Sequence, residues 1–301
     1  MSHPTFSAPL LRCAGVVLRL TPIKTRLGGV STLMCRLFKL QRFTDYVTTT
    51  LRSGAKLRVR LSDYNGRMLY FFGTVDPKVI STCQSLLCPG DTLLDIGANH
   101  GAVGLQCLTS VGADGSVQFV EPQPDLCKVI EDAIESTNAS NAKVHQIGLW
   151  NEDGEFTLQL EGGHTGAASL ADTPEHGDGG GITVKTREIG AFLDETVGDR
   201  SFGAKIDIEG AEVKILPEIL RRSGFRFAVF ECNRDSVREI VHTAADEREL
   251  RLFGIEKNLL TVRLRPLTTS DDLSQFHDIV VVAGDGGSDP ASPVHPSSLK
   301  P

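Results

Sequence analysis

The sequence lacks any run that approaches the roughly 18 apolar residues of a membrane-spanning helix. Its seven cysteines form no C-x-x-C pair. Zinc sites and thiol-redox centres usually use such closely spaced pairs, so the scattered cysteines favour reduced core thiols over a zinc site or a disulfide framework. These absences argue against a membrane span and indicate a cytoplasmic protein.

Acidic residues are missing from the first 44 positions, which hold seven of the 31 Lys and Arg residues. All 38 Asp and Glu residues therefore lie in the rest of the chain, which is more acidic than the net charge of −7 indicates. An acidic body repels phosphate backbones, so we expect no nucleic acid partner. The basic opening allows three interpretations: an arm packed on the core, an organelle-targeting segment, or a helix on anionic lipid.

The G-x-G-x-x-G fingerprint of dinucleotide-binding folds is also absent. In its place, residues 91–104 read DTLLDIGANHGAVG, an apolar run over 92–96 that is broken by Gly97, Asn99 and Gly101. This pattern predicts a strand, a tight turn and a helix that begins near residue 102. Such a junction is where open parallel sheets bind ligands, and this spacing accommodates no pyrophosphate.

After this turn, strand and helix patterns alternate, which predicts βαβ units and a parallel sheet. We expect strands over 116–120, 143–147, 155–160, 227–230, 252–256 and 278–283, and helices over 102–110, 125–136 and 235–249. Glu121 follows the strand over 116–120. A carboxylate at that position can accept hydrogen bonds from both hydroxyls of a ribose, although it can also serve as an ordinary helix cap.

A second informative stretch, AKIDIEGAEVKILPEIL, covers residues 204–220. An apolar strand ends here in Asp207 and Glu209, which alternation directs to the same side, and Gly210 permits a sharp exit into a helix. The strand over 227–230 ends at Glu231, two residues before Asn233. Both stretches therefore place acids at the carboxyl edge of the expected sheet.

With these stretches in view, the chain resembles the FkbM family of class I S-adenosylmethionine-dependent methyltransferases. The matching pieces are PGDTLLDIGANHG (89–101), FVEP (119–122), GLWNEDGEFTL (148–158), GAASL (166–170), ITVKTREIGAFL (182–193), KIDIEGAE (205–212) and VFE (229–231). The resemblance implies a Rossmann-like, seven-stranded, mostly parallel sheet with helices on both faces and an antiparallel last strand. It also implies O-methyl transfer from S-adenosylmethionine to a hydroxyl of a small molecule, sugar or other glycan.

The resemblance assigns roles to individual residues. Cofactor binding maps to Asp95, Gly97, Asn99, Gly101 and Glu121, and the substrate edge maps to Asp207 and Glu209. An aliphatic hydroxyl needs a base or a metal in reach, and Asp207, Glu209 and His100 are the expected bases. His100 is equally compatible with an exposed turn residue. Magnesium held by Asp207 and the Glu231-x-Asn233 pair is a second hypothesis.

Two other functions remain to be separated from this one. A catalytically silent S-adenosylmethionine-binding module would keep the glycine turn and Glu121. A nucleotide-dependent oxidoreductase is disfavoured, because the chain lacks both the G-x-G-x-x-G fingerprint and a Tyr-x-x-x-Lys pair.

The expected organisation has four parts. Residues 1–55 form the basic arm or targeting segment, 56–90 a lead-in, 91–284 the methyltransferase domain, and 285–301 a disordered tail. Within the lead-in we expect a strand over 56–61, and we expect residues 67–90 to form a strand, a turn and a helix. A glycine-rich loop over 162–181, which contains His164, is interpreted as either a substrate-side lid or a linker.

Overall fold

The computed structural model describes residues 18, 28–40, 45–159, 169–170, 181–208, 210–232, 235–247, 249–258, 261–267, 273 and 275–284. The helices are α2 (Gly28–Leu37), α3 (Tyr64–Phe72), α4 (Pro77–Leu86), α5 (Ala102–Val111), α6 (Pro124–Thr137), α7 (Ile189–Thr196), α8 (Glu212–Arg221) and α9 (Asp235–Glu247). The strands before the glycine-rich loop are β1 (Tyr46–Thr50), β2 (Lys56–Arg60), β3 (Thr92–Ile96), β4 (Ser116–Val120), β5 (Ala142–His145), β6 (Gly148–Trp150) and β7 (Gly154–Gln159). The later strands are β8 (Ser169–Leu170), β9 (Gly181–Glu188), β10 (Phe202–Ile206), β11 (Phe225–Glu231), β12 (Leu250–Lys257), β13 (Val262–Leu267) and β14 (Asp278–Ala283).

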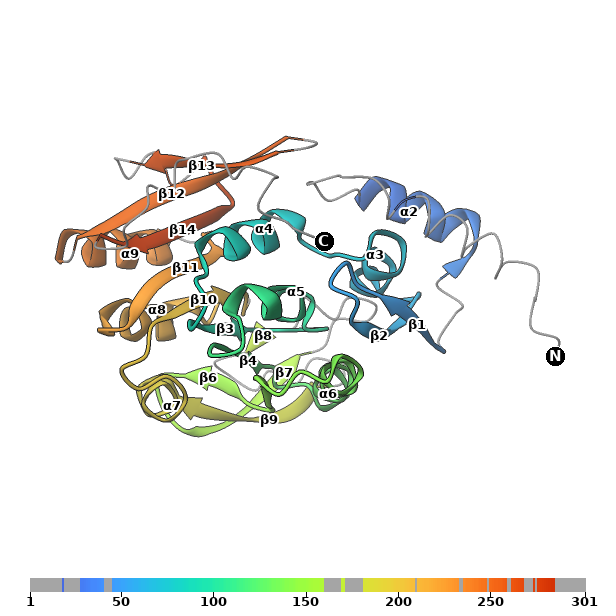
Figure 1. The fold of residues 1–301 in the computed structure, drawn as a ribbon, viewed down its shortest axis with the longest axis horizontal. Helices are drawn as coiled ribbons and strands as arrows, with labels where there is room; N and C mark the ends of the chain where they lie inside the picture. Colours follow the sequence, from blue (N-terminus) through green and yellow to red (C-terminus); the bar gives the residue numbers. More distant parts are fainter. Residues whose placement is uncertain are drawn as a thin grey trace.

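A sheet of eight strands forms the centre of the molecule, in the order β13-β12-β14-β11-β10-β3-β4-β5 (Figure 1). The run from β11 to β5 is parallel, and β14, the last strand in the chain, is antiparallel to β11 and β12. The expected mostly parallel sheet with an antiparallel last strand is confirmed. The eighth strand is β13, which pairs with β12 as an antiparallel neighbour at the sheet edge.

Helices cover both faces of this sheet, as expected. One face carries α4, α5 and α6, whose buried side chains include Ile80, Leu105 and Ile130. The other carries α7, α8 and α9, which bury Phe192 and Ile215 among others. Alternation along the central strands supplies apolar side chains to both layers, which is why the sheet is closed off from water on both faces.

A second sheet, in the order β6-β9-β7-β8, lies beside the first and was not predicted. Its pairings are long-range in sequence: β6 pairs in parallel with β9, and β7 pairs with β9 in antiparallel fashion. Trp150 on β6 is buried against Phe156, at a ring-centroid distance of 5.1 Å. Most of the expected glycine-rich lid, including His164, lies outside the described residues, as do the proposed tail and most of the basic opening.

The predicted strand that begins at residue 67 is wrong, because residues 64–72 form helix α3. Two caps determine this outcome. The Asp63 carboxylate accepts a hydrogen bond from the backbone N of Gly66 at 2.7 Å, and Gly73 ends the helix at φ 67°. An N-cap acid and a left-handed glycine favour a helix over the strand propensity of the aromatic residues between them.

Helix α2 packs on α3 at the opposite end of the molecule from α9 (Figure 1). Its buried residues Cys35 and Leu40, the latter just beyond the helix, join a small cluster with Met68 and Phe71. The described cysteines are all free thiols, and all but Cys88 are buried. Within the described part of the chain, no helix has the length and apolar character required to cross a membrane.

Candidate active site

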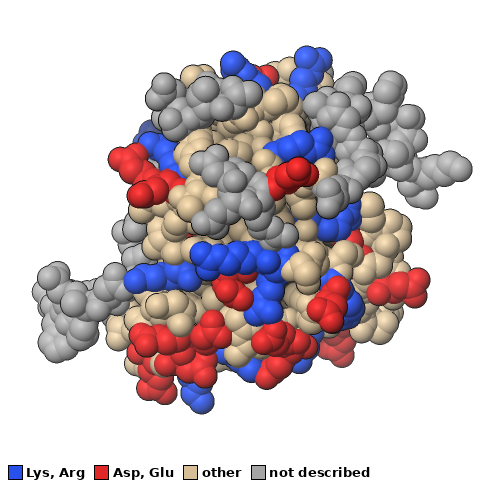
Figure 2. All heavy atoms as spheres, turned by 90° about the vertical axis from the view of Figure 1, so that its left-hand side faces the viewer, with Lys and Arg blue, Asp and Glu red and all other residues tan. Residues whose placement is uncertain are grey.

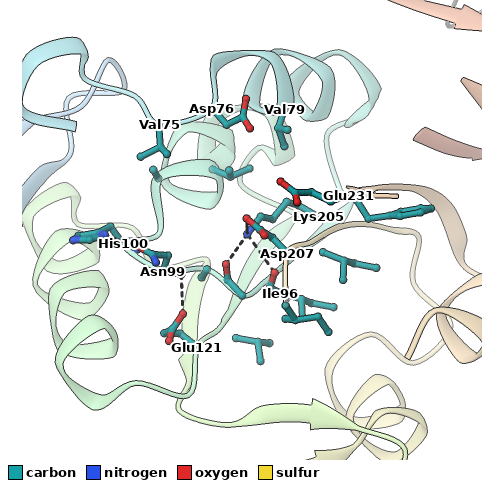
Figure 3. Close-up of a pocket in the computed structure, with 18 of the residues that line it drawn as sticks. Val75, Asp76, Val79, Ile96, Asn99, His100, Glu121, Lys205, Asp207 and Glu231 are labelled. Atoms are coloured by element: carbon teal, nitrogen blue, oxygen red, sulfur yellow. Dashed lines mark hydrogen bonds and ion pairs between the residues drawn. The ribbon is translucent and has the colours of Figure 1, made fainter. Parts of the chain in front are cut away.

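The carboxyl ends of the central parallel strands meet at one edge of the large sheet, next to the amino end of antiparallel β14. Charged side chains stand at these ends: Asp95 on β3, Glu121 after β4, Lys205 and Asp207 at β10, Glu231 on β11 and Asp278 on β14. A pocket opens at this edge, and all of these residues except Asp95 line it (Figure 3). The topology thus gathers residues that are remote in sequence around one cavity.

The glycine turn after β3 forms the floor of this pocket. Gly97, Asn99 and Gly101 all have positive φ, at 68°, 52° and 71°. A Cβ atom at Gly97 would lie 1.9 Å from the carbonyl oxygen of Asp207, so only glycine lets the turn approach the end of β10 this closely. The backbone N atoms of Gly97 and Ala98 both donate to the Val120 carbonyl at 3.0 Å, which ties the turn to β4.

Glu121 lies on the β4 side of the turn and is 3% exposed. Its two carboxylate oxygens accept hydrogen bonds from the backbone N atoms of Asn99, at 2.8 Å, and Gln123, at 3.0 Å (Figure 3). Burial raises the pKa of Glu121 to about 7, although these two hydrogen bonds oppose the rise. The remaining lone pairs of this carboxylate can accept further hydrogen bonds from a ligand in the pocket.

Asp95 and Lys205 form a buried ion pair between adjacent strands, because the β10 and β3 register places them side by side. Lys205 Nζ lies 3.3 Å from Asp95 Oδ1 and donates to the Gly97 carbonyl at 2.6 Å. The other Asp95 oxygen accepts from the Gly104 backbone N at 2.8 Å. Burial lowers the pKa of Lys205, but the Asp95 and Asp207 carboxylates more than offset this, so the net pKa is raised and the ammonium stays charged.

Asp207 lies across the pocket from Glu121 (Figure 3). Its backbone N donates to the Ile96 carbonyl at 3.1 Å, which holds the end of β10 against the glycine turn. The side chain is 42% exposed, and its Oδ2 atom lies 3.8 Å from Lys205 Nζ. Asp207 therefore presents a solvent-reachable carboxylate to the cavity. Glu209 lies outside the described residues.

His100 is buried at 4% exposure and is not an exposed turn residue. Its backbone N donates to Asn99 Oδ1 at 2.9 Å, and its Nδ1 atom contacts the same oxygen. Burial lowers the pKa of His100, opposed by the Asp63 carboxylate, so the ring is neutral near pH 7. His100 and Asp207 line the same pocket, but in Figure 3 the His100 ring points away from Asp207.

Of the predicted magnesium ligands, the structure describes Asp207 and Glu231, which line the same pocket. In the described part of the chain, the Glu231 carboxylate groups instead with His277 and Asp278, all within 4.8 Å of one another, and Asp207 is outside this group. The Lys78 ammonium already pairs with Asp278 and neutralises it. Asn233 lies outside the described residues. A magnesium site at Asp207 and Glu231 therefore has no support from the described residues.

One wall of the pocket comes from the lead-in over residues 56–90. Tyr64 and Asn65 of α3, together with Val75, Asp76 and Val79 around the start of α4, line the cavity. The signal for α3 was present in the Asp63 and Gly73 caps, but the contact of Lys78 with a residue 200 positions later has no local signature.

The sequence model of a protein family described as the methyltransferase FkbM domain matches residues 95–253, more than half of the chain. The chain belongs to the FkbM methyltransferase family. The match begins at Asp95 and so includes the glycine turn, Glu121 and the end of β10. No curated protein was found to match the chain.

Three solved structures similar to this FkbM protein are remote in sequence. The methyltransferase FkbM from Methylobacillus flagellatus KT is 14% identical, with a TM-score of 0.40 over 85% of this chain and 60% of its own. An S-adenosylmethionine-dependent O-methyltransferase from Thermotoga maritima is 10% identical, with a TM-score of 0.38 over 83% and 97% of the two chains. Precorrin-6y C5,15-methyltransferase from Geobacter metallireducens GS-15 is 13% identical, with a TM-score of 0.38 over 69% and 90%.

Membership of the FkbM family makes this chain an S-adenosylmethionine-dependent methyltransferase. Its pocket suits that cofactor in shape and chemistry. Glycine at position 97 lets the turn pack against the end of β10, and the Glu121 carboxylate offers an acceptor in the same pocket. Ile147, Leu149 and Leu158 give the same side of the pocket an apolar lining.

Proposed function

We propose that this chain transfers the methyl group of S-adenosylmethionine to a hydroxyl of a small molecule or glycan. The observation that carries the proposal is the position of Asp207, a half-exposed carboxylate in the same pocket as the glycine turn and Glu121. The pocket therefore has two sides. The turn, Asn99 and Glu121 form the cofactor side, and Asp207 faces the acceptor side.

S-adenosylmethionine, when bound, would supply an electrophilic methyl group on a sulfonium, with the thioether of S-adenosylhomocysteine as the leaving group and the acceptor hydroxyl as the nucleophile. Asp207 receives the proton that the hydroxyl loses, which removes the positive charge that would develop on oxygen. Glu209 is the second candidate for this role. The Lys205 ammonium is held by Asp95 and the Gly97 carbonyl. It attracts the Asp207 carboxylate and so restricts the orientation of that side chain.

The charge of the acceptor side supports a neutral acceptor over a nucleic acid. Asp76, Asp207 and Glu231 line the pocket, and Lys205 is the Lys or Arg residue in its described lining. A phosphate backbone that entered this wall would meet several carboxylates at short range, and Coulomb repulsion grows as water is excluded. Sugar and polyol hydroxyls meet no such repulsion and can donate hydrogen bonds to the carboxylates.

Replacing Glu121 tests the cofactor side. Glu121→Gln is expected to weaken binding of S-adenosylhomocysteine by about 1.5–3 kcal/mol, because a charged hydrogen-bond acceptor is lost. For the wild type, affinity should rise as the pH increases through about 7, where Glu121 ionises. The variant should lack this pH dependence, since the ionised carboxylate is the better acceptor.

Isothermal titration calorimetry across this pH range gives both quantities. Glu131→Gln makes the same chemical change on the exposed surface of α6 and should behave as the wild type. Equal affinity and an equal pH profile for wild type and Glu121→Gln would contradict the assignment of Glu121 to the cofactor.

Replacing Asp207 tests the acceptor side. Asp207→Asn should keep S-adenosylhomocysteine affinity within about twofold and should lower turnover by roughly 10²–10⁴-fold, the usual contribution of a general base. Release of S-adenosylhomocysteine is measured over a panel of sugars, polyols and phenols. Asp199→Asn, an exposed acid after α7, is the matched control.

Turnover by Asp207→Asn at the wild-type rate would remove Asp207 from the reaction and direct attention to Glu209. Cofactor binding by the wild type without turnover on any acceptor in the panel would instead favour a catalytically silent binding module.

A further inference from the structure

Helix α2 carries the exposed large hydrophobic side chains of the described part of the chain. These are Leu33, which is 55% exposed, and Leu37, which is 66% exposed. They are four residues apart, so they lie one above the other on the same helix face. Arg36, also exposed, stands beside them. An isolated exposed leucine needs no explanation, but two that form a stripe on one helix mark a surface for contact.

This helix is already anchored through its other side. Ser31 and Cys35 are buried, and Cys35 packs in the cluster that contains Met68 and Phe71 of α3. The leucine stripe is therefore a separate outward face and not a displaced part of the core. A Cβ at Gly28 would lie 2.7 Å from the Tyr64 hydroxyl, so the start of α2 directly abuts a residue that lines the pocket.

The charge around α2 indicates which kind of surface the leucine stripe contacts. Arg36 and Lys39, both exposed, belong to the first 44 residues, which include seven Lys and Arg and no acid. At the opposite end of the long axis, Asp and Glu side chains gather along the lower edge of the face shown in Figure 2. A second copy that docked through its own α2 would bring the same basic segment against Arg36 and Lys39 and be repelled. An anionic surface would be attracted.

We propose that α2 docks the protein on an anionic lipid surface, with Leu33 and Leu37 in the interface and Arg36 and Lys39 among the headgroups. Apolar side chains and adjacent cations act together in helices that lie on membranes, and neither alone gives stable attachment. In this orientation the α3 wall of the pocket lies directly behind the docked helix. The proposal goes beyond methyl transfer and does not depend on it.

Co-sedimentation of the full chain with vesicles tests the proposal. Vesicles of phosphatidylcholine mixed with phosphatidylglycerol should bind the wild type, and binding should weaken with added salt. Vesicles of phosphatidylcholine alone should not. The Leu33→Ser, Leu37→Ser double variant should lose about tenfold in partitioning, since two interfacial leucines are removed.

Charge reversals provide the matched comparison. Arg36→Glu should lose binding by about tenfold, whereas Arg263→Glu, which makes the same change at an exposed position on β13, should retain it. All substituted side chains are exposed, so circular dichroism and the melting temperature should match the wild type. Equal vesicle binding by wild type and the leucine variant would overturn the proposal, as would no binding to anionic vesicles. Concentration-dependent self-association that the leucine variant abolishes, without vesicle binding, would assign the stripe to a second copy and also overturn it.

Discussion

Gly97→Ala should lower the free energy of unfolding by roughly 2–5 kcal/mol and abolish cofactor binding. The added Cβ would lie 1.9 Å from the carbonyl oxygen of Asp207 and 2.8 Å from its carbonyl carbon. These are backbone atoms, which cannot swing aside as the end of a side chain can. Relief of the overlap would require the glycine turn and the end of β10 to separate, and both segments line the pocket.

Gly198→Ala separates this overlap from backbone strain. Gly198 also has positive φ, at 59°, but the nearest atom to its added Cβ is the Asp194 carbonyl oxygen at 3.8 Å, an ordinary contact. The free energy of unfolding of this variant should fall by only roughly 1–2 kcal/mol, the cost of placing alanine in the left-handed region, and its cofactor affinity should be unchanged. Urea unfolding and calorimetry with S-adenosylhomocysteine measure both effects. Similar losses in the two variants would show that φ alone, and not the approach to β10, explains the glycine.

The elements around the glycine turn were predictable because their signals are local. The strands expected over 92–96 and 116–120 coincide with β3 and β4, and the helix between them begins at Ala102 as expected. Apolar runs bounded by turn residues identify buried strands without any tertiary information. Since parallel strands end at one edge, the sequence also predicted that Glu121 and Asp207 would lie at the same edge of the sheet.

The features that the sequence did not predict depend on contacts between distant segments. Strand β13 was not predicted, because its VRLRPL segment, which contains Pro266, gains its structure from pairing with β12. The second sheet depends on pairings such as that of Gly148 with Thr186. Glu231 and Asp278 lie together because they are paired in the antiparallel register of β11 and β14. No local sequence pattern predicts that register. Contacts between distant segments, and not propensity, determined these features.

Lys205→Met should lower the free energy of unfolding by about 3–5 kcal/mol, because it leaves the buried Asp95 carboxylate without its partner. Asp95 is fully buried, and its Oδ1 atom has Lys205 Nζ at 3.3 Å. Arg265→Met makes a comparable change in an exposed pair with Glu256, at 3.5 Å, and should cost less than about 1 kcal/mol.

Adding Asp95→Asn to Lys205→Met should recover part of the lost stability, since the neutral amide needs no counterion. Urea unfolding of the wild type, the two single variants and this double variant measures each change. The pKa of Asp95 decides between two outcomes. Burial raises that pKa, and the Lys205 ammonium together with the Gly104 hydrogen bond opposes the rise. If the pair is ionic, Lys205→Met must be far more damaging than Arg265→Met. If the two single variants lose similar stability, Asp95 is protonated in the folded protein and Lys205 is held mainly by the Ile96 and Gly97 carbonyls.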